Sequence, residues 1–206
     1  MEIRKIGVVG AGTMGSGIAQ VAAQSGFDVL LVDIASAALA KGLATIAKSL
    51  ERLVAKGKLT AEERDAAQAR LASGGDLAAL AGCDLVVEAV VAEFEIKRQV
   101  LQALDPVLAA SAILATNTSS ISITRLAAAT ARPDRVIGMH FMNPVPLMQL
   151  VEIIRGLQTS QETCDAVFAT TRKLQRTPVE VNDAPGFVSN RVLMPMINEA
   201  IFCLHE

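Results

Sequence analysis

Residues 4–33 read RKIGVVGAGTMGSGIAQVAAQSGFDVLLVD, and this stretch decides the fold. Residues 4–9 are a short, β-branched apolar run, which predicts a buried strand. Residues 13–26 predict a helix, and residues 28–33 predict a second buried strand. Only a glycine-containing turn separates the first strand from the helix. The stretch therefore predicts a strand–helix–strand unit whose two strands lie parallel, because a helix connects them.

The turn between the first strand and the helix predicts a nucleotide site. It follows the pattern GxGxxG, with Gly10, Ala11, Gly12, Thr13, Met14 and Gly15. Glycines at these positions allow a tight turn and a close approach of the backbone to a pyrophosphate, which meets free N–H groups at the helix N-terminus. Asp33 ends the second strand, where a carboxylate accepts hydrogen bonds from a ribose 2′-hydroxyl. Together they indicate a Rossmann-type dinucleotide-binding fold.

The residues after Asp33 indicate which dinucleotide is bound. Ile34 and Ala35 follow it, so no arginine is present there to pair with a 2′-phosphate, which the carboxylate would repel. The pattern favours NAD over NADP and predicts a dehydrogenase. The alternative is an ordinary strand–helix turn with a capping aspartate.

The same alternation of strands and helices continues along the chain. Its nearly continuous apolar strands predict a parallel sheet covered by helices on both faces, an α/β doubly wound fold over residues 1–184. Residues 188–206 predict one further helix, whose apolar residues point in nearly every direction, so this helix is expected to have neighbours on all sides. The remaining predicted strands are 84–90, 112–115, 136–141, 148–154 and 178–182; the helices are one from Ser36, one from Thr60 to about Leu71 before a turn at 73–75, and 94–109, 123–129 and 161–174.

Composition excludes several classes of function. The chain has 206 residues, 51% of them hydrophobic, and a net charge of −2 with no run of basic residues, so nucleic acid is not expected as a partner. Three widely spaced cysteines and two histidines disfavour a disulfide framework and a metal site, and fit a reducing cytoplasm. Six glycines interrupt the uncharged residues 6–27, which argues against a membrane span.

A histidine and a glutamate in the second half are candidates for acid–base chemistry. Removal of hydride from a hydroxyl-bearing carbon requires a base for the hydroxyl proton. His140 lies near the end of a predicted strand, whereas His205 lies in the last turn of the final helix. Glu152 lies inside the apolar run LVEII, and a glutamate that accepts the imidazole N–H fixes its tautomer. The alternatives are a core histidine with satisfied hydrogen bonds and a surface glutamate on an edge strand.

Four separated segments resemble the 3-hydroxyacyl-CoA dehydrogenase family, in the same order and over essentially the whole chain. The resemblance implies reversible NAD-linked oxidation of a short-chain (S)-3-hydroxyacyl-CoA, such as 3-hydroxybutyryl-CoA, to the 3-ketoacyl-CoA. Two alternatives remain open: another NAD-dependent hydroxyacid dehydrogenase of the same superfold, and a non-catalytic NAD-binding homologue or fragment. The segments are GAGTMGSGIAQ (10–20), ATNTSSISIT (115–124), GMHFMNPVPLMQLVEIIRG (138–156) and DAPGFVSNRVLMPMINEA (183–200).

The resemblance also implies roles for residues at the reacting end of the substrate. His140 would be the general base and Glu152 would orient it. Ser119 and Asn190 would hydrogen-bond the substrate oxygens, with Ser119 also touching the cofactor and the CoA substrate. Asn143 would lie near the nicotinamide. From composition alone, Ser119 is a turn or helix-cap serine and Asn190 a residue at a helix N-terminus.

Further roles concern the cofactor and the coenzyme A moiety. Glu88 and Lys97 would face the cofactor, and Ser49 and Lys56 would meet coenzyme A. From composition alone, Lys56 is a solvated lysine. The family pattern has a second acid four residues after Glu88, where this chain has Ala92 followed by Glu93. Either Glu93 substitutes for that acid, or a cofactor-side contact to Lys97 is lost.

The resemblance finally implies an assembly. Family members continue into a C-terminal all-α domain that packs over the active-site cleft and makes a dimer contact, and residues 185–206 would be the start of its first helix. We therefore expect a homodimer formed through a domain that is largely beyond residue 206. We also expect a cytoplasmic location. Whether the 206 residues turn over substrate would then depend on that domain.

Overall fold

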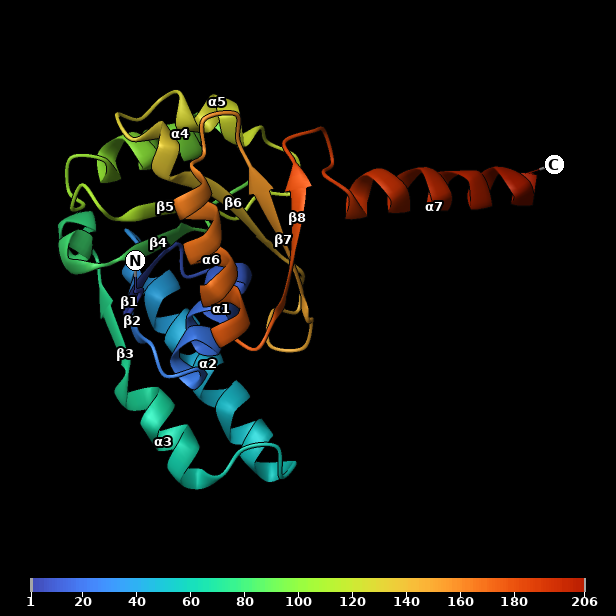
Figure 1. Cartoon of the computed structure of the whole chain (residues 1–206). Coiled ribbons are helices and arrows are strands. Elements are labelled where there is room, and N and C mark those ends of the chain that lie inside the picture. The colour runs from blue at the N-terminus through green and yellow to red at the C-terminus, as the bar shows by residue number, and fades with distance from the viewer. Residues whose placement is uncertain (1, 206) are drawn as a thin grey trace.

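The computed structural model describes residues 2–205, which form one eight-stranded sheet with helices on both faces (Figure 1). The strand order is β3-β2-β1-β4-β5-β6-β7-β8, and all neighbouring strands are parallel except β6 and β7. The α/β doubly wound fold is therefore confirmed. The strands are β1 (Lys5–Val9), β2 (Asp28–Val32), β3 (Leu71–Gly74), β4 (Leu85–Glu88), β5 (Ile113–Thr116), β6 (Val136–Phe141), β7 (Leu150–Arg155) and β8 (Thr177–Asn182).

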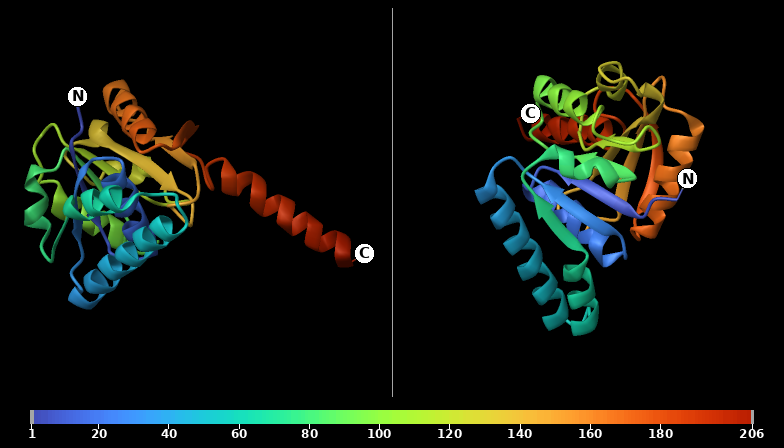
Figure 2. Two further views of the ribbon diagram at one scale, coloured as in Figure 1. Left: turned by 90° about the horizontal axis from the view of Figure 1, so that it is seen from below. Right: turned by 90° about the vertical axis from the view of Figure 1, so that its left-hand side faces the viewer.

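Helices cover both faces of the sheet (Figure 2), and a cluster of buried apolar side chains lies between the helices and each face. On one face, α1 (Thr13–Gln24), α2 (Ser36–Ala55), α3 (Ala61–Ala69) and α6 (Gln161–Lys173) bury residues such as Ile18, Leu50 and Val167. On the other face, η1 (Leu77–Gly82), α4 (Phe94–Leu104) and α5 (Ile123–Ala127) bury residues such as Leu80, Leu101 and Leu126. A single helical turn, η2 (Pro133–Arg135), leads into β6. This layering leaves the carboxyl ends of the central strands available for a ligand.

One predicted element was wrong. The helix that starts after the Thr60 cap ends at Ala69, and residues 71–74 form strand β3 instead of a helix end and a turn. This strand lies at the sheet edge beside β2, with Ala72 and Ser73 exposed. An edge strand that buries little carries no apolar alternation, so its sequence contained no strand signal.

The antiparallel pair β6–β7 determines which side chains meet. A connection as short as residues 142–149 cannot cross over the sheet, so the chain returns antiparallel beside the strand it has just left. The turn contains a cis peptide bond between Asn143 and Pro144. The register places His140 directly opposite Glu152. Side chains at directly opposite positions lie on the same face of the sheet.

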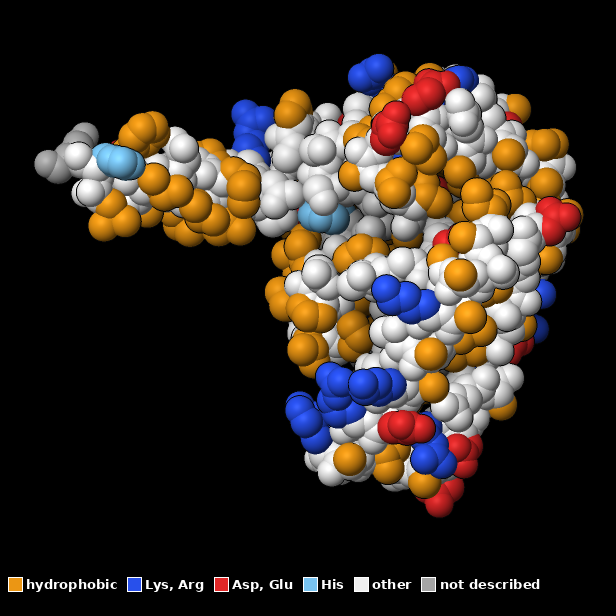
Figure 3. All heavy atoms as spheres, turned by 180° about the vertical axis from the view of Figure 1, so that it is seen from behind, with side chains coloured by type: hydrophobic (Ala, Val, Ile, Leu, Met, Phe, Trp, Pro, Cys, Tyr) orange, Lys and Arg blue, Asp and Glu red, His pale blue; other side chains and the backbone are white. Residues whose placement is uncertain are grey.

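Helix α7 (Ser189–His205) projects away from the sheet and has no buried residue (Figures 1 and 3). Apolar side chains gather along it, and Val192, Met196 and Leu204 are each more than half exposed. The helix contains Pro195. No helix among residues 2–205 has both the length and the hydropathy required to cross a bilayer.

Asp183 joins the end of β8 to the start of α5. Its Oδ2 accepts from Ser122 Oγ (2.7 Å) and Thr124 N (2.8 Å), and its Oδ1 accepts from Ile123 N (3.0 Å). Burial acts to raise the pKa of this carboxyl, but the hydrogen bonds from Thr124, Ser122 and Ile123 outweigh it, and the pKa is lowered. The ionised form is therefore the one that the fold stabilises.

Asp183→Asn is expected to reduce the loss of stability in acid. A carboxyl whose pKa is lowered by folding contributes stability above its unfolded value of about 4, and that contribution is lost as the pH falls through the folded value. The wild type should therefore show a steeper fall in Tm below about pH 4 than Asp183→Asn does. Thermal unfolding across pH measures this, with exposed Asp28→Asn as the control. If Tm fell equally steeply with falling pH in Asp183→Asn and in the wild type, this prediction would be contradicted.

Candidate functional site

The loop between β1 and α1 is shaped by its glycines. Gly10 has φ of +100°, and a Cβ there would lie 2.8 Å from the carbonyl oxygen of Ala89. A Cβ on Gly15 would lie 1.8 Å from the carbonyl oxygen of Gly10, so α1 approaches the loop more closely than any side chain allows. Around Gly12, by contrast, a Cβ would meet nothing within 4 Å. The loop is tight on its inner side and open on its outer side.

The open side of this loop fits a pyrophosphate. No side chain caps α1 at Gly12 among the described residues, so the N–H groups of its first turn are available to an anion. Gly12 and Thr13 are exposed there, while Met14 is half-buried and packs against the core. The residues present therefore suit a dinucleotide at this position.

Asp33 is held against the same loop. Its Oδ2 accepts from Ala11 N (2.8 Å), and its Oδ1 accepts from Ala35 N (2.9 Å). Each carboxylate oxygen keeps acceptor capacity after one such bond, so the half-buried side chain can still receive ribose hydroxyls. The contact with Ala11 was not foreseen from the sequence. It joins the Asp33 carboxylate to the glycine loop, the two features for which the sequence predicts contacts with ribose and pyrophosphate.

A groove of about 400 Å³ runs beside the glycine loop. Its lining includes Gly12 and Thr13 of the loop, Ser49 of α2, and Asn143 of the β6–β7 turn. The turn is seated tightly, because a Cβ on Gly17 of α1 would lie 2.8 Å from Cβ of Val145, which itself is buried. The fold thus brings Ser49 and Asn143 to the loop. Lys56 does not line this groove.

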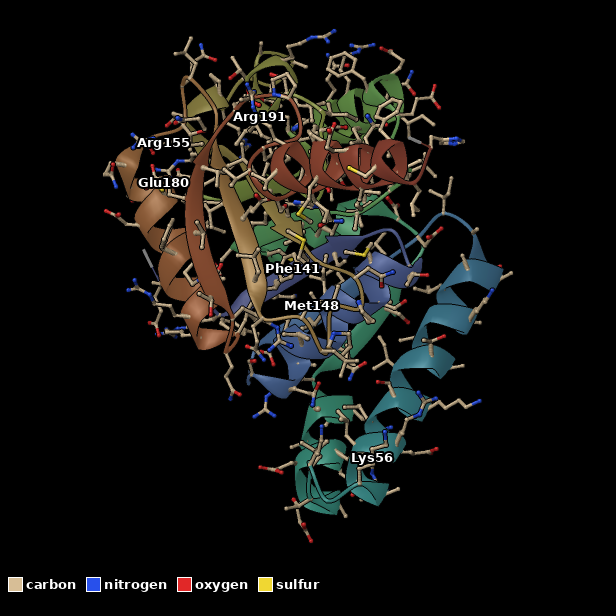
Figure 4. All side chains as sticks on the ribbon, turned by 90° about the vertical axis from the view of Figure 1, so that its right-hand side faces the viewer. Lys56, Phe141, Met148, Arg155, Glu180 and Arg191 are labelled. Atoms are coloured by element: carbon tan, nitrogen blue, oxygen red, sulfur yellow. The ribbon has the colours of Figure 1, made fainter. Side chains whose placement is uncertain are left out.

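Lys56 lies at the far end of α2, away from Phe141 at the end of β6 (Figure 4). Seven residues of helix separate it from Ser49, a rise of about 10 Å. Basic side chains gather over this end of the molecule (Figure 3). Lys48 and Arg52 precede Lys56 at four-residue steps along α2, and all three are exposed, as is Lys58 just after the helix. A ligand that touched both Ser49 and Lys56 would have to be extended and anionic.

His140 and Glu152 form a buried pair. His140 Nδ1 and Glu152 Oε2 are 2.7 Å apart, and the two residues are 6% and 2% exposed. Because a carboxylate only accepts, Nδ1–H donates and Nε2 is left as the basic nitrogen. The Phe187 ring stands edge-on to the imidazole, with centroids 5.9 Å apart. Together these contacts hold the imidazole ring in one orientation.

Glu152 receives three more hydrogen bonds. Ser189 N (2.8 Å) and Val188 N (3.1 Å) donate to Oε1, and Ser189 Oγ (2.8 Å) donates to Oε2. Burial acts to raise the pKa of Glu152, but the bonds from Ser189, His140 and Val188 together lower it. The carboxylate is therefore ionised at neutral pH, as an acceptor for His140 must be.

Ser119 and Asn190 meet at the base of α7. Asn190 Nδ2 donates to the carbonyl oxygen of Ser119 (3.4 Å), although the two residues are 71 positions apart. Both line a hollow of about 510 Å³ that also includes Gly186 and Met194. Ser119 is exposed there. The structure therefore brings these two together beside the turn that holds Glu152.

Glu88 and Lys97 are placed differently from the position that the resemblance implies. Both side chains are 0% exposed, with Lys97 Nζ 2.8 Å from Glu88 Oε1. Lys97 Nζ also donates to the carbonyl oxygens of Val90 (3.4 Å) and Asn117 (3.2 Å), in the loops after β4 and β5. Side chains fully enclosed by protein cannot face a cofactor directly. Instead, Lys97 joins the loops that follow β4 and β5.

The same geometry shows whether Glu93 takes the place of the acid that the family pattern has at position 92. Among the described residues the Glu93 carboxylate makes no hydrogen bond or ion pair with the Lys97 ammonium, and the two residues are joined through the backbone, where Lys97 N donates to the Glu93 carbonyl oxygen (3.1 Å). Glu93 is exposed and precedes α4 without capping it by its side chain. Ala92 is exposed as well. Lys97 takes its carboxylate partner from Glu88 instead, so Glu93 does not substitute for the missing acid.

Comparison with known proteins identifies the family. The sequence profile described as "3-hydroxyacyl-CoA dehydrogenase, NAD binding domain" matches residues 5–184. This chain belongs to the 3-hydroxyacyl-CoA dehydrogenase family. Its cofactor is NAD, and its enzyme class is that of an NAD-dependent dehydrogenase.

Relatives of this dehydrogenase include both curated sequences and solved structures. It is 56% identical over 202 residues to the "Probable 3-hydroxybutyryl-CoA dehydrogenase" of Deinococcus radiodurans, over 98% of this chain and 72% of the relative. The Bacillus subtilis protein of the same name is 52% identical, over 100% of this chain and 72% of that relative. The structure of (S)-3-hydroxybutyryl-CoA dehydrogenase PaaH1 from Ralstonia eutropha superimposes on this chain with a TM-score of 0.95. The two are 52% identical in sequence, and the match covers 97% of this chain and 70% of the other.

Sequence reasoning missed two residues that support the site of this dehydrogenase. Asn117 follows β5 directly; its Oδ1 accepts from Phe141 N (3.0 Å), which links the end of β5 to the end of β6. The rule that ligands bind at the carboxyl ends of strands could have pointed to it. Ser189 was quoted within the last motif but given no role. No sequence signal assigns it to Glu152, which is 37 positions away.

Proposed function

We propose that this chain catalyses the NAD-dependent interconversion of (S)-3-hydroxybutyryl-CoA and acetoacetyl-CoA. The observation that carries the proposal is the buried His140–Glu152 pair at 2.7 Å. In the sequence, His140 is three residues before Asn143, and Asn143 lines the groove beside the glycine loop. Oxidation of a hydroxyl group requires a base close to the dinucleotide site, and the β6–β7 turn, which begins just after His140, reaches that site. The names of the relatives supply the acyl-CoA substrate.

His140 carries the proton transfer in this proposal. Its Nε2 accepts the proton of the 3-hydroxyl during oxidation, and the imidazolium returns it during reduction. Glu152 holds the ring through Nδ1 and stabilises the imidazolium that forms. The glycine loop and Asp33 would hold NAD, which would supply the hydride acceptor for C3 of the substrate.

Three further polar residues are proposed to hold the substrate and the nicotinamide. Ser119 Oγ and the Asn190 amide are proposed to hydrogen-bond the substrate oxygens, because both line the hollow at the base of α7. Asn143 is proposed to lie near the nicotinamide, since it lines the groove beside Gly12 and Thr13. This arrangement would place the reacting carbon between the base and the cofactor.

The coenzyme A moiety is proposed to lie along α2. Ser49 lines the groove, and Lys56 follows it two helical turns later among other exposed basic residues. Coenzyme A is long and carries several phosphates, so it can reach from the reacting centre to this basic end. Lysine binds phosphate as a point charge and needs no fixed geometry.

The direct test follows NADH oxidation with acetoacetyl-CoA as substrate and free acetoacetate as the comparison. We expect turnover with the thioester and at least about 100-fold lower kcat/KM with the free acid, since the acid lacks the CoA contacts. Tight NADH binding without turnover of either would support a non-catalytic NAD-binding protein. Equal turnover of both would support another hydroxyacid dehydrogenase.

Asp33→Ala is expected to weaken NADH binding by about 10- to 100-fold, because hydrogen bonds to a charged group are lost. The affinity for acetoacetyl-CoA should change less than about 2-fold, since Asp33 contacts the glycine loop and not α2 beyond its start. Fluorescence titration of each ligand measures this. Asp28→Ala, exposed at the start of β2, is the matched control. Equal losses for both ligands would contradict the ribose assignment.

A further inference from the structure

We propose that Ser189 is a positioning residue for the base: its hydroxyl and its N–H hold the Glu152 carboxylate in the one orientation that aims His140 at substrate. This inference rests on the proposed function. Ser189 touches neither the imidazole nor, in the arrangement above, the substrate. It acts through Glu152.

The hydrogen bonds of Glu152 carry the proposal. Oε2 accepts from both His140 Nδ1 (2.7 Å) and Ser189 Oγ (2.8 Å), and Oε1 accepts from Ser189 N (2.8 Å) and Val188 N (3.1 Å). Two donors on each oxygen fix the plane of the carboxylate as well as its position. The carboxylate cannot rotate without breaking bonds on both oxygens. Among residues 2–205, the hydroxyl of Ser189 is the one side-chain donor to Glu152 besides His140.

The backbone before Ser189 is bent to deliver these donors. Gly186 has φ of +75° and Phe187 has φ of +51°, so two successive residues adopt the left-handed conformation. For phenylalanine this conformation is unfavourable and must be held by its surroundings. Phe187 is 2% exposed and packs edge-on against His140. The turn therefore aims two successive N–H groups at Oε1 while its buried ring supports the imidazole.

The same bonds connect α7 to the base. Helix α7 has no buried residue, and its first residue is Ser189. A carboxylate placed at the N-terminus of a helix is favoured by the free N–H groups and by the helix dipole. Glu152 is thus the acidic partner of the α7 N-terminus, and the orientation of His140 depends on where that helix begins.

The test compares two substitutions of almost equal shape, Ser189→Val and Ser189→Thr. Valine removes the hydroxyl, whereas threonine keeps it. We expect Ser189→Val to lower kcat for acetoacetyl-CoA reduction by about 10-fold, the scale of one hydrogen bond to a charged group, with KM for NADH within about 2-fold. Ser189→Thr should keep kcat within about 3-fold of wild type. Equal kcat in valine and threonine variants would overturn the proposal.

A spectroscopic measurement keeps this test independent of turnover. The Nδ1 proton of His140, shared with a carboxylate at 2.7 Å, should give a far-downfield proton resonance that His140→Gln abolishes. We expect Ser189→Val to move or broaden this resonance and Ser189→Thr to leave it in place. An unchanged resonance in Ser189→Val would overturn the role of Ser189. Absence of turnover in the wild type would instead count against the proposed function, while the resonance still reports on Ser189.

Discussion

Replacing His140 by glutamine is expected to lower kcat for the reduction of acetoacetyl-CoA by about 10²- to 10⁴-fold, because a positioned acid–base group contributes that much to proton transfer. Glutamine retains a polar side chain that can donate to Glu152, but it cannot exchange a proton with the substrate at neutral pH. The loss should therefore fall on the chemical step. Steady-state rates with NADH measure it.

Measuring NADH binding shows whether the lower kcat of His140→Gln is a loss of chemistry or a consequence of misfolding. His140→Gln should bind NADH within about 3-fold of wild type, since the imidazole is not part of the glycine loop. His205→Gln, exposed near the end of α7, is the matched control and should retain full kcat. Retention of more than about a tenth of kcat by His140→Gln would rule out His140 as the general base.

Lys97→Met should destabilise the fold by about 3–5 kcal/mol, because it removes one partner of a buried ion pair and leaves the other charge uncompensated. Both side chains are 0% exposed, so water cannot take the place of the ammonium. Glu88 would keep only its hydrogen bonds from Thr116 Oγ and Val90 N, both 2.6 Å. Urea unfolding gives the free energy directly.

A second variant tests whether the pair accounts for that effect. Glu88→Gln combined with Lys97→Met removes both charges, so its loss should be smaller than the sum of the single losses. Lys173→Met, at the exposed end of α6, is the matched control and should change stability by less than about 0.5 kcal/mol. A loss below about 1 kcal/mol in Lys97→Met would mean that the pair behaves like an exposed one.

Much of the fold was accessible from the sequence because its determinants are local. The β1–α1–β2 unit depends on apolar runs and glycines that are adjacent in the chain, and each run has the period of its own element. Asp33 could be expected beside the glycine loop because its distance from the glycines is set within one such unit, and the structure places it there. Strand β3 was missed because an exposed edge strand has no such period.

The candidate site was only partly accessible, since its contacts join distant segments. His140 and Glu152 could be paired because a short turn connects their strands, although the direct register was seen only in the structure. Lys97 was expected to face the cofactor, and burial against Glu88 reversed that expectation. A lysine has the same sequence signature whether it is solvated or enclosed.

By itself, then, the sequence determined the doubly wound fold and the dinucleotide loop, because periodicity and glycine spacing act over a few residues. Tertiary structure alone decided that Ser189 holds Glu152, that Asn190 meets Ser119, and that Lys97 supports loops from within. These contacts depend on which strands become neighbours and where α7 begins. The physical reason is that packing across the sheet, and not local conformational preference, selects the partners of buried polar groups.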